Sequence, residues 1–308
     1  MNRRPLGSTG IEVGEIGLGC WQLDNPAWGG PGEEESLAIV DEALRLGVDL
    51  FDTAPGYGSG RSEELVGRAL EGRRDEAVIV TKFGHTADGE TDFSAARVEP
   101  ALAESLERLR TDRVDVFLLH NPPPELHDGS AEVYRELERL QAGGSIRAYG
   151  VSVDRAVDLD RVLDTTGSTV VEVLLNVFHQ EPLAACERAH ANGVGVVPKV
   201  PLDSGWLTGK YRASSRFEGV RGRWSEAEIA RRAELVERFE ALLPEGVTST
   251  EGALGFLLAQ ECVSAVIPGA KSVAQLRDLA AATALPPDAA EALRGLWREQ
   301  IEATPLPW

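Results

Sequence analysis

Eight short apolar runs alternate with longer amphipathic segments, and this alternation constrains the fold more than any other feature of the chain. Most runs are continuously apolar and five to eight residues long, which is typical of parallel strands covered on both faces. The segments between them place apolar residues at helical spacing, as at Leu37, Val40 and Leu44. The runs are Ile16–Trp21, Val48–Ala54, Ala77–Gly84, Val114–His120, Ala148–Val153, Val170–Asn176, Val194–Val200 and Val263–Gly269.

Eight strand and helix units in succession predict an α/β fold, a single (β/α)8 barrel domain over residues 1–308. An open doubly wound sheet with a helical appendage is the alternative. A Gly-Ser-Thr-Gly turn within Arg4–Ile16 predicts a short β-hairpin before the barrel. Two features fit less well. Pro198 would remove a ladder hydrogen bond from the seventh run, and Asp203–Trp224 is a long loop of the kind that is usually functional or mobile.

Charge and cysteine content exclude several classes of protein. The chain has 50 acidic and 31 basic side chains and a net charge of -19, whereas duplex binding depends on Lys and Arg, so we expect no nucleic-acid partner. No run approaches about 18 apolar residues, and we expect neither a membrane span nor a cleavable signal. Three widely spaced cysteines, Cys20, Cys186 and Cys262, favour reduced thiols and a cytoplasmic location.

Polar residues stand near the carboxyl ends of three neighbouring runs, where (β/α)8 barrels place their active sites. These are Asp52, Lys82 and His120, and Tyr57 follows Asp52 in a glycine-rich loop. A phenol has a reference pKa near 10, so Tyr57 needs a cation beside it to exchange a proton at neutral pH. Lys82 would be that cation, and Asp52 would keep a buried lysine charged.

The sequence resembles the aldo-keto reductase family in four motifs and in their order. The motifs are FDTAPGYGSGRSEELVGRAL from Phe51, TKFG from Thr81, VDVFLLHNP from Val114 and IPGAKSVAQL from Ile267. The resemblance runs from LGSTGIEVGEIGLGCW to the last strand and helix. It implies a catalytic tetrad of Asp52, Tyr57, Lys82 and His120, and a nicotinamide cofactor extended across the barrel mouth. The implied reaction interconverts an aldehyde or ketone, possibly sugar-derived, with its alcohol; Tyr57 donates the proton and His120 orients the carbonyl oxygen.

The resemblance also implies which residues hold the cofactor. Ser152 stands where the nicotinamide carboxamide is bonded, although Val153 replaces the usual asparagine beside it. Glu172 stands where relatives carry glutamine, and Lys199 where an aromatic residue or arginine packs on the nicotinamide. The implied contacts are Gly19, Cys20, Trp21, Asp52, Ser152, Glu172, Lys199, Pro201, Leu202, Ser204, Gly205, Leu207, Gly209, Lys210, Pro268, Gly269, Ala270, Lys271 and Gln275.

Charge favours NADP (as NADPH) as that cofactor. The stretch Lys199–Arg232 has eight basic and four acidic residues, which suits an anionic ligand. Lys271 is placed to pair with a 2′-phosphate. NAD stays as the alternative, because Gly269 and Leu279 replace a lysine and an adenine-binding asparagine that are frequent in relatives. No GxGxxG follows a strand, which excludes a Rossmann site.

Aromatic residues near the run tips predict a pocket for a small carbonyl or alcohol substrate with an apolar face, such as the underside of a sugar. We expect Trp224, Trp297 and Trp308 to be packing residues. The pocket residues are Trp21, Trp28, His120, Asn121 and Trp206.

Two other functions stay open. A metal-dependent barrel hydrolase would use Asp52, His85, His120 and His127, but the chain has no His-x-His pair, and we expect no metal. A silent cofactor-binding sensor or partner subunit would share the fold. The substrate, reaction direction and oligomeric state depend on loop conformations that sequence patterns leave open.

Glu172 and Lys199 fall at one site on adjacent strands if the motif placement holds. We therefore expect an ion pair in which Lys199 keeps Glu172 charged beside the nicotinamide. A carboxylate nearer the ring than the ammonium would favour the oxidised cofactor. A register slip of one residue would turn either side chain out of the pocket.

Overall fold

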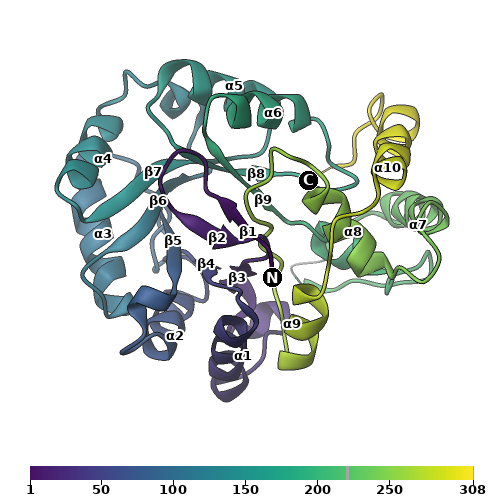
Figure 1. Ribbon diagram of the computed structural model, residues 1–308, viewed down its shortest axis with the longest axis horizontal. Helices are drawn as coiled ribbons and strands as arrows, with labels where there is room; N and C mark the ends of the chain where they lie inside the picture. The colour runs from purple at the N-terminus through teal and green to yellow at the C-terminus, as the bar shows by residue number, and fades with distance from the viewer. Residues whose placement is uncertain (220–221, 308) are drawn as a thin grey trace.

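Seven parallel strands form one curled sheet in which spatial order follows sequence order (Figure 1). The computed structural model describes residues 1–219 and 222–307, with the main chain alone at Trp28. The strand order has no reversal, which an open doubly wound sheet would need. The strands are β3 (Leu18–Gly19), β4 (Leu50–Asp52), β5 (Val78–Phe83), β6 (Val114–His120), β7 (Ile146–Val153), β8 (Val170–Leu174) and β9 (Gly195–Lys199).

The eighth apolar run joins the two edges of this sheet without forming a regular strand. Parallel bridges connect Val263 to Val196 of β9 and Val266 to Ile16 beside β3. The predicted barrel fold is confirmed, with one correction: seven ladder strands and one bridging segment replace eight regular strands.

Pro198 explains why pairing between β9 and the bridging segment is so short. The amide of Ser264 donates to the Val196 carbonyl oxygen at 2.9 Å, whereas the amide of Gly195 donates toward β8, to the Thr169 carbonyl oxygen. Alternate residues of a strand direct their main-chain groups to the same side. Pro198 therefore turns its missing N–H toward the bridging segment and leaves the β8 ladder intact.

Helices cover the outer face of the sheet, and each strand from β3 to β9 is followed by one (Figure 1). α7 and α8 begin at capping boxes, formed by Ser225 with Glu228 and by Thr248 with Glu251. Among the helices of the described ranges, none is both long and apolar enough to span a bilayer. The helices are α1 (Glu33–Leu46), α2 (Arg61–Ala69), α3 (Ala95–Leu109), α4 (Glu132–Ala142), α5 (Ala156–Thr165), α6 (Leu183–Ala191), α7 (Glu226–Ala241), α8 (Ser249–Leu258), α9 (Val273–Ala280) and α10 (Pro287–Gln300).

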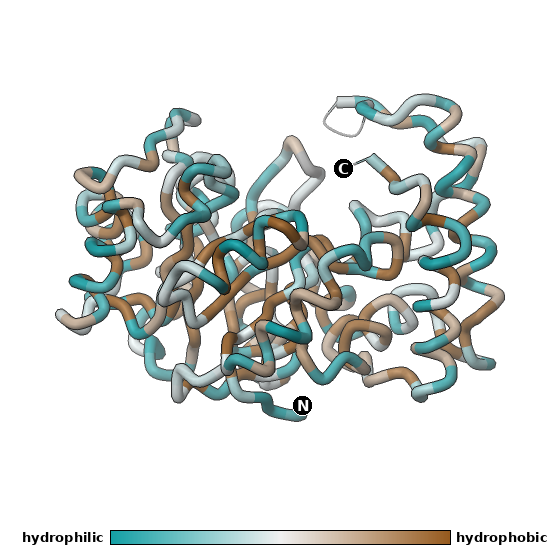
Figure 2. The backbone as a smooth tube through the Cα atoms, turned by 90° about the horizontal axis from the view of Figure 1, so that it is seen from above, coloured by the Kyte–Doolittle hydropathy of each residue, from teal (hydrophilic) through white to brown (hydrophobic). Residues whose placement is uncertain are grey.

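The sheet separates two apolar cores. The outer core lies between strands and helices, and the inner core fills the barrel. The predicted hairpin is present as β1 (Arg3–Pro5) and β2 (Glu12–Gly14), and its segment contributes Leu6, Ile11 and Val13 to the inner core. Apolar stretches run through the interior in Figure 2, where the N-terminus lies at the lower edge. The inner core also contains Leu50, Val78, Val80, Val116, Leu118, Ala148, Val170, Val197, Ala265 and Ile267.

Gly150 lies on β7 at a point where the barrel leaves no room for a side chain. A Cβ there would lie 1.6 Å from the Val170 carbonyl oxygen, and a strand main chain cannot rotate away as a side chain can. We expect Gly150→Ala to lower the free energy of unfolding by about 3 kcal/mol, measured by urea denaturation.

Gly295 is the matched control, because its Cβ would have Arg298 Nη2, at 4.0 Å, as its nearest neighbour. It lies inside α10, where alanine is favoured over glycine, so Gly295→Ala should stabilise the protein by about 0.5–1 kcal/mol. Equal effects of the two substitutions would contradict the steric argument.

Candidate active site

The polar side chains at the barrel mouth continue the inward-facing rows of the strands. Lys82 follows Val80 of the inner core by two residues on β5, and alternate residues of a strand share a face. His120, Ser152 and Glu172 are level with one another, because the register pairs His120 with Ser152 and Ser152 with Glu172. The lumen is therefore apolar along its length and polar where β4 to β9 end.

Lys82 is completely buried and lies at the centre of this polar group. Its Nζ is 2.7 Å from both carboxylate oxygens of Asp52, 3.1 Å from the Thr53 carbonyl oxygen and 3.2 Å from Tyr57 Oη. It is also 3.2 Å from Glu172 Oε2. Burial alone would lower the pKa of Lys82, but the charges of Asp52 and Glu172 raise it well above its ordinary value. The lysine is therefore an ammonium.

Tyr57 lies between this ammonium and two aromatic rings. Its ring centroid is 4.6 Å from that of Trp21 and 5.8 Å from that of His120, both in edge contacts. Burial raises the pKa of the Tyr57 hydroxyl above its ordinary value, and the charge of Lys82 acts in the opposite direction. The charge of Lys82 thus lowers the Tyr57 pKa, as predicted, but burial raises this pKa by more.

His120 ends β6 and is neutral at physiological pH. Burial, followed by the charges of Lys82 and Lys199, lowers the pKa of the imidazole well below its ordinary value. Its Nδ1 is buried without a hydrogen-bond partner among the described residues. The ring centroid of His85 is 5.2 Å away, so an imidazole pair and Tyr57 lie on one side of the mouth.

The expected ion pair between Glu172 and Lys199 is wrong. The register places Val197 opposite Glu172 and Leu174 opposite Lys199, so the two side chains stand one pleat apart along the barrel. Glu172 pairs instead with Lys82 at 3.2 Å. The physical reason is the stagger of barrel strands, which offsets residues that a motif alignment places side by side.

Lys199 contacts a different carboxylate, Asp154, at 2.8 Å. Its Nζ also donates to Asn121 Oδ1 at 2.6 Å and to Ser152 Oγ at 2.9 Å. Ser152 Oγ lies 3.2 Å from Glu172 Oε1. The Ser152 hydroxyl therefore links the two groups that were expected to pair directly.

The segment after β9 borders the mouth and carries the implied pyrophosphate contacts. It begins with Pro201 and Leu202 and continues into the short helix η5 (Asp203–Thr208), where Ser204 and Gly205 have left-handed φ angles of 55° and 98°. The Gly205 N–H of this turn donates to the Leu202 carbonyl oxygen at 2.8 Å. The remaining implied contacts here are Leu207, which is buried, Gly209, which ends η5, and Lys210, whose ammonium lies over the Tyr211 ring.

A second segment, Pro268–Lys271, follows the bridging run on the other side of the mouth. Gly269 is packed so closely that a Cβ would lie 1.7 Å from Gln22 Oε1. That amide oxygen is buried and has no hydrogen-bond partner among the described residues. A glycine beside the unpaired Gln22 amide oxygen fits a ligand that carries a hydroxyl or amide donor. The main-chain amide of Lys271 donates to Gln275 Oε1 at 2.9 Å.

Trp206 is a correction to the predicted substrate pocket. It is completely buried, with its ring centroid 5.4 Å from Tyr211, 5.5 Å from Phe217 and 5.8 Å from Trp224. It therefore anchors the segment after β9 and does not line a pocket. Trp21 is 38% exposed and its ring contacts Tyr57, and its place in a substrate pocket stays a prediction. Of the other candidates, Trp297 is buried, Gly19 and Cys20 lie at the end of β3, Ala270 is buried, and the Trp28 side chain and Trp308 lie outside the described residues.

Two polar residues at the mouth were missed by the sequence analysis. Asp154 stands two residues beyond Ser152 and so continues the inward row of β7, a signal that the alternation contains. Gln22 lies in the short helix η1 (Cys20–Gln22), and no sequence pattern distinguishes it.

The four residues of the hydrolase alternative do not form a ligand set. His127 is buried in the short helix η4 (Pro124–His127), 3.2 Å from Asp158 and 3.1 Å from the Pro122 carbonyl oxygen. Within residues 1–219 and 222–307, no group of three or more His, Cys, Asp or Glu side chains could hold a metal ion.

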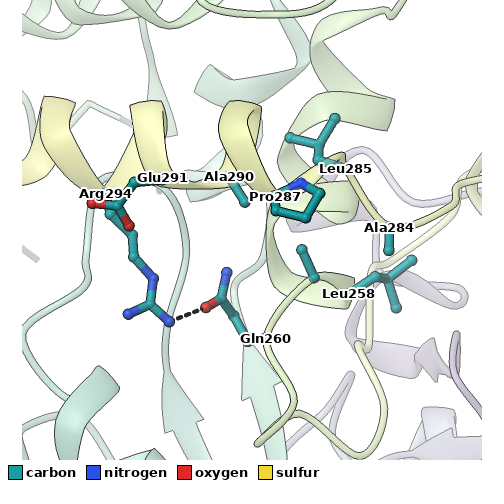
Figure 3. Close-up of a pocket in the computed structure, with 9 residues that line it drawn as sticks. Leu258, Gln260, Ala284, Leu285, Pro287, Ala290, Glu291 and Arg294 are labelled. Atoms are coloured by element: carbon teal, nitrogen blue, oxygen red, sulfur yellow. Dashed lines mark hydrogen bonds between the residues drawn. The ribbon is translucent and has the colours of Figure 1, made fainter.

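A pocket of about 420 Å³ lies at the ends of α8 and α10, apart from the tetrad (Figure 3). Its wall is mainly aliphatic, and Arg294 donates to Gln260 across it. Arg294 also pairs with Glu187 at 3.0 Å, so its charge is already compensated. Glu291, the other charged residue of the lining, pairs with Arg298 at 2.6 Å.

The fold and the mouth together define a (β/α)8 barrel with a tyrosine beside a buried lysine at its mouth. The sequence profile of the Aldo/keto reductase family matches residues 15–298, and the chain belongs to that family of oxidoreductases.

Individual relatives are similar along nearly their whole length. The chain is 30% identical over 283 residues to the uncharacterized oxidoreductase YqkF of Bacillus subtilis (strain 168), covering 90% of each protein. It is 29% identical to the NADH-specific methylglyoxal reductase of Escherichia coli (strain K12), covering 98% of this chain and 99% of that protein. The holo form of aldo-keto reductase AKR11C1 from Bacillus halodurans has a TM-score of 0.82 at 28% identity over 96% of each chain. The family resemblance of the motifs is thereby confirmed.

We expect the His120 imidazole to stay uncharged from pH 8 to pH 6, measured by imidazole NMR, because burial and two cations disfavour the charged form. Lys82→Met removes one of those cations and should raise the His120 pKa. Arg45→Met is the control, since Arg45 is a largely exposed cation on α1, and it should leave His120 unchanged. A His120 midpoint near the reference value of about 6.5 in the parent protein would contradict this account.

Proposed function

We propose that the protein is an NADP-dependent oxidoreductase that transfers a hydride between the nicotinamide and an aldehyde or ketone and its alcohol, with Tyr57 as general acid–base. The observation that carries the proposal is the position of Lys82 Nζ, 3.2 Å from Tyr57 Oη and 2.7 Å from the Asp52 carboxylate. A phenol with an ammonium at hydrogen-bond distance has a counter-charge ready for its anion. Membership of the family supports the reaction class.

Each residue of the tetrad has a role in this reaction. The bound nicotinamide supplies or takes up the hydride. Tyr57 donates its hydroxyl proton to the carbonyl oxygen during reduction and takes it back during oxidation. Lys82 stabilises the phenolate, Asp52 holds Lys82 in place, and neutral His120 orients the substrate oxygen by a hydrogen bond.

The cofactor would lie across the mouth between the two segments described above. Ser152 and Glu172 would face the nicotinamide end, the left-handed turn at Ser204 and Gly205 would face the pyrophosphate, and Lys271 would face the adenosine end. Lys271 supports NADP, and the NADH-specific relative supports NAD as the alternative. The substrate is a small carbonyl compound or alcohol that packs against Trp21, and we place the enzyme in the cytoplasm.

Tyr57→Phe should reduce turnover to below about a tenth while changing NADPH affinity by less than about threefold, because the hydroxyl supplies a proton and does not hold the cofactor. Steady-state kinetics with a panel of carbonyl compounds and fluorescence titration of NADPH measure both quantities. Tyr149→Phe is the control, because Tyr149 is buried near Glu138 on α4, and it should keep full turnover. Larger residual activity in Tyr57→Phe would overturn the role, and cofactor binding without any turnover in the parent protein would indicate a sensor.

Lys271→Ala should weaken NADPH binding at least about tenfold and NADH binding hardly at all, since a charge-assisted phosphate contact contributes about 1.5–3 kcal/mol. Arg298→Ala, which removes an exposed cation of α10, should leave both affinities unchanged. Equal weakening of the two cofactors would remove Lys271 from the phosphate site. Tight NADH binding by the parent protein would reverse the assignment to NADP.

A further inference from the structure

Two carboxylates share the single ammonium of Lys82. Its Nζ is 2.7 Å from Asp52 Oδ2 and 3.2 Å from Glu172 Oε2, and the exposed fractions of the three side chains are 0%, 4% and 3%. If all three groups were ionised, the buried cluster would carry a net charge of one negative unit. The tetrad alone does not explain this second carboxylate.

Like charges in one buried site disfavour joint ionisation, so such a pair retains a proton that a single salt-bridged carboxylate would lose. The ammonium compensates one of the two negative charges, and burial leaves the other weakly screened. Burial and the charge of Glu172 raise the pKa of Asp52 to about 8. Asp52, beside Glu172, therefore retains a proton at neutral pH.

The groups that face Glu172 come from every neighbouring strand and leave this proton on the pair. Lys82 of β5 and Asp52 of β4 are the titratable neighbours in contact. Ser152 of β7 is neutral, and Lys199 of β9 reaches Glu172 only through the Ser152 hydroxyl, since its own carboxylate partner is Asp154. His120 of β6 is neutral because its pKa is lowered by burial.

We propose that Glu172 is a positioning residue that, with Asp52, stores the proton from which Tyr57 is recharged after each reduction. The inference rests on the proposed function. Glutamine at this position would keep a similar shape and hydrogen bonds but could not hold an exchangeable proton.

The proton balance closes over one reduction. Tyr57 loses its hydroxyl proton to the carbonyl oxygen as the hydride reaches the carbonyl carbon, so the alcohol gains both. The phenolate takes a proton from the Lys82 ammonium, and Lys82 takes one from the protonated carboxyl of the pair. The cluster ends with one proton fewer and regains it from solvent, with Ser152 and Lys199 bordering the route.

The first test measures the folding equilibrium and needs no turnover. An Asp52 carboxyl with a pKa of about 8 in the folded chain and about 3.9 in the unfolded chain stabilises the fold at low pH, and this stabilisation is lost as pH rises toward 8. Urea unfolding should show that the folding constant of the parent protein falls relative to Glu172→Gln between pH 5 and pH 8, by up to about tenfold per pH unit.

Glu15→Gln is the matched control for this comparison. Glu15 is a buried carboxylate at the opposite end of the barrel, 3.1 Å from Arg4, and its removal should leave the pH dependence of the parent protein unchanged between pH 5 and pH 8. Parallel curves for the parent protein and Glu172→Gln would overturn the proposal.

Infrared spectroscopy of the parent protein gives a second measurement, which does not depend on whether Glu172→Gln folds. A buried carboxylic acid band should be present at pH 7 and disappear with a midpoint near pH 8, the value to which the Asp52 pKa is raised. Its absence at pH 7 would overturn the proposal. Turnover of carbonyl compounds distinguishes this inference from the proposed function. A parent protein that shows the carboxylic acid band at pH 7 but has no turnover contradicts the proposed function alone.

Discussion

The ammonium of Lys82, fully buried at the mouth of an apolar barrel, is the interaction on which the rest of the site depends. Removing such a charge from water costs several kcal/mol unless the ion is paired and hydrogen-bonded, so its surroundings must supply acceptors. Asp52, the Thr53 carbonyl oxygen, Tyr57 and Glu172 do so within 3.2 Å. These groups come from β4, the loop after it and β8, whereas Lys82 itself lies on β5. Pairing one buried cation therefore brings together residues that are far apart in the sequence.

Burial is the common cause of the unusual acid–base properties at the mouth. It is the largest influence on the pKa values of Asp52 and Tyr57, which it raises, and of His120, which it lowers. The same apolar lumen that stabilises the barrel thus lowers the pKa of an imidazole and raises the pKa of a carboxyl. Scaffold and chemistry are not separable here, because the low dielectric that tunes the groups is the packed inner core itself.

A second buried ion pair holds the segment that borders the mouth after β9. Arg232 of α7 pairs with Asp203 of η5, and its other guanidinium nitrogen donates to the Pro307 carbonyl oxygen at 2.8 Å. Burial would raise the pKa of Asp203, but Arg232 and His179 outweigh it and keep the carboxyl ionised. With Trp206 packed against Trp224 above it, this pair fixes the left-handed turn at Ser204 and connects it to the C-terminal segment.

The sequence by itself determined the barrel and the identity of the residues at its mouth. Continuous apolar runs, helical spacing between them and polar residues at the tips are local patterns, and the order of the motifs already indicates that Asp52, Tyr57, Lys82 and His120 lie together. Their catalytic roles stay a prediction. Only the tertiary structure decided that Glu172 pairs with Lys82 instead of Lys199 and that Trp206 is buried. It also decided that the eighth apolar run connects the two edges of the sheet through isolated bridges and not through a regular strand. These three features depend on the stagger between neighbouring strands and on how deeply a side chain is buried beneath other segments. Both are set by the way the strands close around the core, and neither produces a periodic pattern in the sequence.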